Sequence, residues 1–335
     1  MKSKDWSFLD ILVARLIRKF GLIFIVFFME SCALLSSGRF LRYDERSISV
    51  LSLNLFDQRT APLDVEQSWK GDWLFRRERL ELVDRALLEV RPDLLAFQQM
   101  ISRKGSPSES DQSILSFGAL DGYQWHLDMV NFYEDTQEEQ YFGLAIGLPL
   151  QIGEKAPSSN GKLGVDGYYS INRVMLQEQG VWLVNVQMPK KAKKVDVWYD
   201  VLERKLSAFL NKHQICRQRV IVAGYLPGRS SWPFYQEFLA GLELKDTSSG
   251  FCEVAQDCHT ANPRNELFFV SSDGKSGSQS ERILAHNQTI VYSSKPAINE
   301  SSSGTRRSSQ YGLQRLWPSR EFAWNSILRL SRCQQ

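Results

Sequence analysis

The sequence has little net charge and few histidines. Its 41 Lys and Arg residues are nearly matched by 38 Asp and Glu residues, so the formal net charge is +3. Electrostatic binding to nucleic acid depends on an excess of Lys and Arg that neutralises phosphates. A net charge this small excludes a simple electrostatic nucleic-acid binder, and we do not expect nucleic acid as a partner. Only four histidines are present, which leaves few groups for proton transfer near neutral pH.

Cysteines are also few, and their spacing does not fit a zinc site. The chain has five, with no CxxC pair and no Cys/His cluster. Four of them, Cys216, Cys252, Cys258 and Cys333, form an even set that is able to make disulfides in an exported protein. Cys252 and Cys258 are close in sequence and are the pair that we favour, with free thiols as the alternative.

An apolar run of about 20 residues, the length that spans a bilayer, is missing near the N-terminus. The apolar stretch from Phe20 to Met29 is shorter and follows a basic start, which is typical of a signal peptide. Cys32 comes soon after it, preceded by Ser31, and resembles the acylated cysteine of a bacterial lipoprotein. This pattern predicts export and membrane attachment in a bacterial cell envelope. An uncleaved anchor and a helix packed on the domain are the alternatives.

Hydrophobic patterning along the rest of the chain predicts strands alternating with helices. Apolar and β-branched runs predict strands at 47–56, 94–97, 144–146, 181–186 and 220–223. Apolar positions at helical spacing predict helices over 74–90, 198–209 and 234–239. Nothing in the sequence after residue 45 repeats or reads as a long linker. We therefore expect an export segment over 1–32, a short linker over 33–44 and one α/β domain over 45–330.

Six short stretches lie in a fixed order near the predicted strand ends. They are LSLN (51–54), PDLLAFQQ (92–99) after a helix, GLAI (143–146) before Pro149, NVQM (185–188), GYLP (224–227) and SSQYG (308–312). In this order they resemble the motifs of the endonuclease/exonuclease/phosphatase superfamily, which includes DNase I-like nucleases, neutral sphingomyelinases and inositol-phosphate phosphatases. The resemblance covers roughly residues 47–317. It implies a four-layer α/β sandwich of two packed β-sheets flanked by helices.

The same resemblance implies that the family's catalytic groups are replaced. Only Asn54 keeps the family's identity. The other matching positions are Gln99 for the metal-binding glutamate, Gln187 for the first histidine, Tyr225 and Pro227 for an aspartate and an asparagine, and Ser309 and Gln310 for an aspartate–histidine pair. Phosphoester hydrolysis of this kind needs carboxylates for the metal and titrating groups for proton transfer. We therefore expect no functional catalytic site, no bound metal and no cofactor.

The family's other metal-site aspartate can be placed in two ways. The stretch 264–270 keeps an acid at Glu266, whereas 281–284 keeps the Arg-Ile pair and loses the acid. We favour the second placement, because its distance from the last motif is more usual. If the protein were active, Asn54 and Glu266 would be the expected ligands of Mg²⁺ or Mn²⁺.

These observations favour a catalytically inactive relative, attached to the membrane through its N-terminus, that binds an unidentified ligand or partner in the former active-site cleft. The alternatives are a metal-dependent phosphodiesterase of nuclease or sphingomyelinase type with a rearranged centre, and a structural envelope lipoprotein. A basic run follows the strand that ends at Gln187 and is a candidate contact for phosphates or anionic lipid headgroups, with a solvated loop as the alternative. Its residues are Lys190, Lys191, Lys193 and Lys194.

Overall fold

A computed structural model of the chain divides into two units, Met1–Glu45 and Arg46–Gln335. The structure describes residues 47–54, 76–103, 123–134, 139–149, 159–163, 167–176, 179–189, 195–227, 231–251, 281–297, 305–308, 312–315 and 323–333. All of them belong to the second unit. The expected export segment with Cys32 lies outside these ranges. Among the helices that the structure does describe, none is long and apolar enough to cross a membrane.

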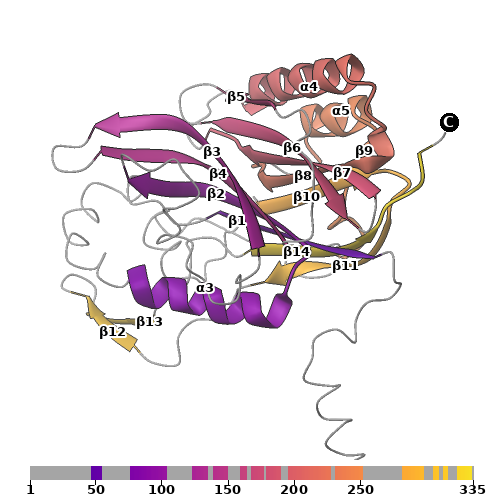
Figure 1. Ribbon diagram of the computed structural model, residues 1–335. Helices are drawn as coiled ribbons and strands as arrows, with labels where there is room; N and C mark the ends of the chain where they lie inside the picture. Colours follow the sequence, from indigo (N-terminus) through magenta and orange to yellow (C-terminus); the bar gives the residue numbers. More distant parts are fainter. Residues whose placement is uncertain are drawn as a thin grey trace, which may run out of the picture. The chain divides into compact units, whose positions relative to one another are not determined.

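Two six-stranded sheets form the centre of the second unit (Figure 1). The first sheet has the order β11-β14-β1-β2-β4-β3. Its strands are β1 (Ile48–Asn54), β2 (Leu94–Arg103), β3 (Tyr123–Glu134), β4 (Glu139–Pro149), β11 (Ile290–Ala297) and β14 (Ala323–Arg329). β1 runs parallel to β2 and antiparallel to β14, so a strand from the end of the chain lies beside the first one.

The second sheet has the order β5-β6-β7-β8-β10-β9. Its strands are β5 (Ser159–Lys162), β6 (Tyr168–Leu176), β7 (Gln179–Gln187), β8 (Val220–Tyr225), β9 (Leu244–Asp246) and β10 (Glu281–His286). β7 and β8 are parallel, and the helix α4 (Val195–Lys212) connects them. A separate two-stranded sheet pairs β12 (Thr305–Ser308) with β13 (Gly312–Arg315).

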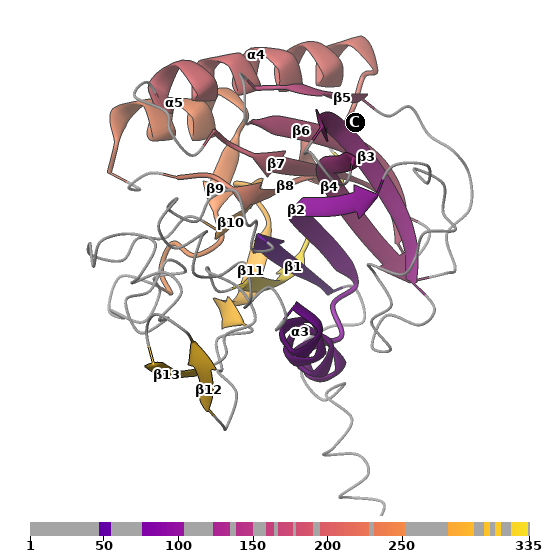
Figure 2. The ribbon, with the colours of Figure 1, turned by 90° about the vertical axis from the view of Figure 1, so that its left-hand side faces the viewer.

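Helices cover the outer faces of both sheets, as Figures 1 and 2 show. α4 and α5 (Pro233–Gly241) pack on the second sheet through a shared apolar cluster that includes Tyr199, Leu206 and Phe238. α3 (Arg76–Val90) lies on the side of the first sheet, and its Val83 and Leu87 are fully buried. The layers are therefore helix, sheet, sheet and helix, which confirms the predicted four-layer α/β sandwich.

The core between the two sheets follows from the alternation of side chains along each strand. Val50 and Leu94 of the first sheet pack there with Leu183 and Ile221 of the second. The next residue along each strand points to the opposite face, so Val184 and Val222 pack under α4 and α5. Burying both faces of these strands explains why they are apolar over most of their length.

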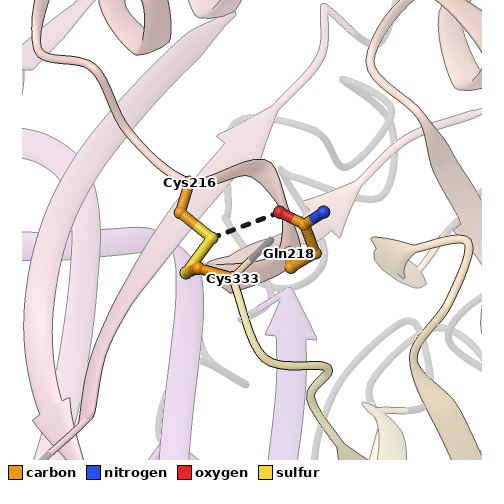
Figure 3. Close-up of a disulfide and its surroundings, with 3 residues drawn as sticks. All are labelled: Cys216, Gln218 and Cys333. Carbon is orange, nitrogen blue, oxygen red and sulfur yellow. Dashed lines mark hydrogen bonds between the residues drawn. A yellow bond between two sulfur atoms is a disulfide. The ribbon is translucent and has the colours of Figure 1, made fainter. Parts of the chain in front are cut away.

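A disulfide between Cys216 and Cys333 joins the two sheets at one end (Figure 3). Cys216 precedes the short 3-10 helix η6 (Arg217–Arg219) that leads into β8, and Cys333 follows β14. Gln218 Oε1 lies 3.2 Å from Cys216 Sγ. The sequence predicted disulfides in this set of cysteines but favoured a different pair, Cys252–Cys258, which lies outside the described residues.

Candidate functional site

Four strand ends and the middle of β2 meet at one edge of the space between the sheets. Asn54, the last residue of β1, is the register partner of Gln98 in β2. Gln187, the last residue of β7, is the partner of Tyr225 in β8, and Tyr225 is in turn the partner of Glu281 in β10. These pairings, together with the hydrogen bonds below, bring the ends of β1, β7, β8 and β10 together with Gln98 of β2.

Polar side chains at these ends point into the space between the sheets. β1 directs Val50 into the inter-sheet core, so alternation directs Ser52 and Asn54 the same way. The same count from Leu183 in β7 places Asn185 and Gln187 on this face. The inter-sheet layer is therefore apolar along most of its length and becomes polar where the strands end.

Hydrogen bonds across the two sheets connect this polar group. Gln98 Nε2 donates to Asn185 Oδ1 at 2.7 Å and lies 3.3 Å from Ser52 Oγ. The Ser52 hydroxyl donates to Glu281 Oε2 at 2.8 Å. Asn185 Nδ2 donates to the carbonyl oxygen of Phe97 at 2.9 Å. We call Ser52, Asn54, Gln98, Asn185 and Glu281 the inter-sheet polar cluster; every member is buried, and Glu281 is 0% exposed.

Three buried polar atoms at this end have no hydrogen-bond partner among the described residues. They are Gln98 Oε1, Gln187 Oε1 and Ser170 Oγ. Ser170 lies on β6 as the register partner of Asn185, so it borders the cluster. Leaving a buried polar atom unsatisfied costs about 1–3 kcal/mol. Native structures contain only a few such atoms, so these three mark the strand-end edge as the candidate site.

Asn54, Gln187 and Tyr225, three of the predicted site residues, end β1, β7 and β8 at this edge. Gln187 is 2% exposed, and its Nε2 donates to the Met188 carbonyl oxygen at 3.0 Å. Tyr225 is only partly buried. Pro227 follows in the loop after β8, where its carbonyl oxygen accepts a hydrogen bond from the Tyr199 hydroxyl at 3.3 Å.

The expected strand end at Gln99 is wrong, because β2 continues through it to Arg103. The pairing of β2 with β4 shifts register between Phe97 and Met100, where β2 carries one extra residue. The residue whose side chain is described in the polar cluster is Gln98. The side chain of Gln99 lies outside the described residues, as do Ser309, Gln310, Glu266 and the four lysines of the basic run.

Sequence reasoning missed four members of the cluster: Ser52, Gln98, Asn185 and Glu281. Ser52 and Asn185 could have been found from the sequence, because each lies two residues before a predicted site residue and therefore points to the same face of the strand. Glu281 had no such signal, since the stretch 281–284 was read as having lost its acid. Its carboxylate points into the space between the sheets, whereas Leu284, where the resemblance places the lost acid, packs under α4 and α5.

The opposite face of β10 carries a second buried group that fixes the loop after β8. Arg282 forms an ion pair with Asp246, and its Nε donates to the Leu226 carbonyl oxygen at 3.1 Å. The Tyr235 hydroxyl donates to Asp246 Oδ2 at 2.8 Å. Burial raises the pKa of Tyr235 well above its usual value, and the Asp246 charge adds to this effect. Burial alone lowers the pKa of Arg282, but Tyr235 and Asp246 outweigh it and raise that pKa, so the guanidinium stays charged.

Gly224 allows β7 and β8 to approach closely at the same strand end. Its φ is +145°, and an added Cβ would lie 2.0 Å from the Val186 carbonyl oxygen. No side chain larger than hydrogen fits there, so this glycine is required for the approach. The Met188 amide then donates to the Tyr225 carbonyl oxygen at 3.0 Å, which extends the pairing past the end of β7.

Comparison with known proteins gives relatives by structure alone. No protein-family model and no curated protein sequence matches the chain. An endonuclease/exonuclease/phosphatase family protein from Bacteroides thetaiotaomicron is similar with a TM-score of 0.59 and 14% identity, over 84% of this chain and 97% of that one. The chain has the endonuclease/exonuclease/phosphatase fold.

Two further solved structures share this fold. The mannosyl-6-phosphatase of Bacteroides thetaiotaomicron matches with a TM-score of 0.58 and 16% identity, over 84% of this chain and 99% of that one. The human Nocturnin catalytic domain with bound sulfate matches with a TM-score of 0.57 and 14% identity, over 86% and 95%. At these identities the likeness shows the endonuclease/exonuclease/phosphatase fold and does not extend to activity.

The donors of the polar cluster suit a hard cation better than a soft one. Glu281 and Gln98 offer carboxylate and amide oxygens, which are the atoms that Mg²⁺, Mn²⁺ and Ca²⁺ prefer. No group of three or more His, Cys, Asp or Glu side chains gathers anywhere in the described part of the chain. Glu281 is the one charged ligand that the described cluster could offer such a cation. When bound, such a cation would neutralise negative charge on a phosphate.

Proposed function

We propose that this chain is a catalytically inactive protein of the endonuclease/exonuclease/phosphatase fold. Gln187 carries the proposal, because it ends β7 where the resemblance places a catalytic histidine. Its amide is 2% exposed and hydrogen-bonded to the Met188 carbonyl oxygen. An amide does not exchange a proton near neutral pH, so this position cannot act as an acid or base.

The rest of the strand ends supports the same proposal. Asn54, Gln98 and Asn185 are neutral amides, and Tyr225 is a phenol. Glu281 is the one carboxylate in the inter-sheet polar cluster, and it is fully buried. General acid–base catalysis is typically worth about 10²–10⁴-fold. Without its proton-transfer group, the edge retains hydrogen-bonding capacity for a ligand but lacks the chemistry of hydrolysis.

The test is an assay for Mg²⁺- and Mn²⁺-dependent hydrolysis of DNA, sphingomyelin, inositol phosphates and mannose 6-phosphate by the purified protein. We expect no turnover above the metal-only background. The variant Gln187→His should also stay inactive, because catalytic groups that act as a unit contribute non-additively. Metal-dependent turnover by the unmodified protein that is lost in Asn54→Ala would overturn the proposal.

A phosphodiesterase with a rearranged centre is the second candidate, and Glu281 is the observation that favours it. This carboxylate reaches the cluster from β10 and accepts a hydrogen bond from Ser52. Glu281 would replace the metal-binding glutamate that the resemblance places at Gln99. Turnover lost in Glu281→Gln but kept in the matched surface variant Glu243→Gln would establish this reading, since both changes remove one carboxylate charge.

We further propose that the protein is exported and held at a bacterial cell envelope membrane through Cys32. The basic start, the short apolar run and the cysteine motivate this assignment. The disulfide between Cys216 and Cys333 supports it, because disulfides persist in oxidising compartments and are rare in the cytosol. Its ligand or partner would meet the strand-end edge beside Tyr225, the partly exposed residue there.

Membrane attachment is tested by fractionating cells that express Cys32→Ser. This change should release the protein from the membrane fraction or leave it unprocessed, because the acylated atom is gone. The matched variant Cys252→Ser should fractionate like the wild type. Soluble behaviour of the wild type itself would contradict the lipoprotein assignment.

A further inference from the structure

Arginines from two distant parts of the chain meet at the end of the sandwich opposite the strand-end edge. Arg217 and Arg219 belong to η6, just before β8 begins, and Arg332 follows β14. The disulfide holds their sequence neighbours Cys216 and Cys333 at a Cα–Cα distance of 5.9 Å (Figure 3). β8 starts at this end and runs to the strand-end edge, so the length of that strand separates the two regions.

Two of these arginines repel each other. Burial lowers the pKa of Arg219, and the nearby charge of Arg332 lowers it further. Both guanidinium groups stay charged all the same, because arginine does not lose its proton in proteins. Arg217 has a counter-charge, since its Nη1 lies 3.1 Å from Glu243 Oε1, but the other oxygen of Glu243 lies 3.4 Å from His286 Nε2. An anion bound beside Arg219 and Arg332 would relieve their repulsion.

Exposed neighbours extend this surface. Lys212 ends α4 and is exposed. Ser331 Oγ donates to the Gln288 carbonyl oxygen at 2.7 Å, which places the segment after β14 beside the turn that follows β10. Ile290 begins β11 directly after that turn and is 42% exposed. Basic and exposed apolar side chains together suit the boundary between lipid headgroups and acyl chains. We call Lys212, Arg217, Arg219 and Arg332 the basic end.

The chain enters the sandwich on the same side as the basic end. Ile48 at the start of β1 is the register partner of Leu328 near the end of β14. Cys32, the attachment point proposed above, precedes β1 in the sequence. A tether from Cys32 to a membrane therefore joins the described part of the chain at this end. Basic residues close to a membrane attachment point are attracted to anionic headgroups.

We propose that the basic end docks on anionic lipid headgroups of the membrane to which the protein is attached. This inference rests on the proposed attachment through Cys32 and adds an orientation to it. The basic end faces the membrane, and the strand-end edge at the other end of β8 faces away from it. The ligand or partner of that edge would then reach it from the aqueous phase.

The experiment uses the full-length chain with Cys32→Ser as the background, so that no acyl chain contributes to binding. Co-sedimentation is measured with vesicles of phosphatidylcholine alone and of an equimolar mixture of phosphatidylcholine and phosphatidylglycerol. The background protein should prefer the anionic vesicles. Each basic residue near an anionic surface contributes roughly fivefold, so adding Arg217→Gln/Arg332→Gln should lower the preference about 25-fold.

Two further variants sharpen the result. Glu243→Gln removes the carboxylate beside Arg217 and should raise the preference about fivefold. The matched control Arg85→Gln/Arg204→Gln removes the same charge from exposed positions on α3 and α4 and should leave the preference unchanged. Raising the salt from about 0.1 M to about 1 M shortens the screening length from about 10 Å to about 3 Å and should remove the preference.

Absence of a preference in the background protein would overturn the docking surface, as would an undiminished preference in Arg217→Gln/Arg332→Gln. If that variant does not fold, Arg332→Glu at an exposed position is the second test, and an undiminished preference there would also overturn it. Arginine-dependent vesicle binding, with a wild type that fractionates as soluble protein, would support the docking surface and refute the Cys32 attachment. A membrane-bound wild type whose background protein shows no vesicle preference would do the reverse.

Discussion

Removing the disulfide between Cys216 and Cys333 should cost a large share of the stability of the domain. The bond closes a loop with a sequence separation of 117 residues. Loop-closure entropy for a loop of this length corresponds to about 5 kcal/mol at 25 °C, and losses of about 2–5 kcal/mol are typical for native disulfides. Since the bond also joins β14 of one sheet to the start of β8 in the other, we expect the double variant Cys216→Ser/Cys333→Ser to lose about 2–5 kcal/mol in its free energy of unfolding.

The assay is equilibrium unfolding in urea, followed by tryptophan fluorescence, with and without a reducing agent. Cys333 is exposed, so the reductant can reach the bond in the folded protein. In a Cys252→Ser/Cys258→Ser background, which removes the other predicted disulfide, reduction should destabilise the protein by the same amount as adding Cys216→Ser/Cys333→Ser, while the quadruple variant should not respond. A double variant within about 0.5 kcal/mol of the wild type, the range of ordinary surface substitutions, would refute the idea that this bond constrains the unfolded chain.

Two other substitutions test the backbone and the buried ion pair. Gly224→Ala should destabilise the domain by about 3 kcal/mol or more, because the new Cβ meets the Val186 carbonyl oxygen. Gly250→Ala is its matched control: φ there is +86° with nothing within 4 Å, so the urea midpoint should report a loss of only about 1–2 kcal/mol. Asp246→Asn should cost about 3–5 kcal/mol by leaving the Arg282 charge buried and uncompensated, and adding Arg282→Met should recover part of it. An Asp246→Asn variant as stable as the wild type would show that the pair is not needed.

The local elements of this protein could be predicted from its sequence because they depend on neighbouring residues. Helical spacing of apolar positions predicted the helices over 74–90 and 198–209, and α3 and α4 are observed at Arg76–Val90 and Val195–Lys212. Apolar runs predicted β1, β7 and β8. The strand over Ala323–Arg329 was not predicted, because its place beside β1 depends on pairing with a strand near the start of the domain.

The sequence by itself determined which residue types stand at the strand ends, and the neutral character of Gln187 and Tyr225 needed no coordinates. Which residues meet there was decided by the tertiary structure. Gln98, which the sequence did not single out, joins the polar cluster at the point where the register of β2 against β4 shifts. Ser52 reaches Glu281 across 229 residues of sequence. Contacts of this range arise when two sheets pack face to face, and side-chain alternation within one strand carries no information about the strand on the other side.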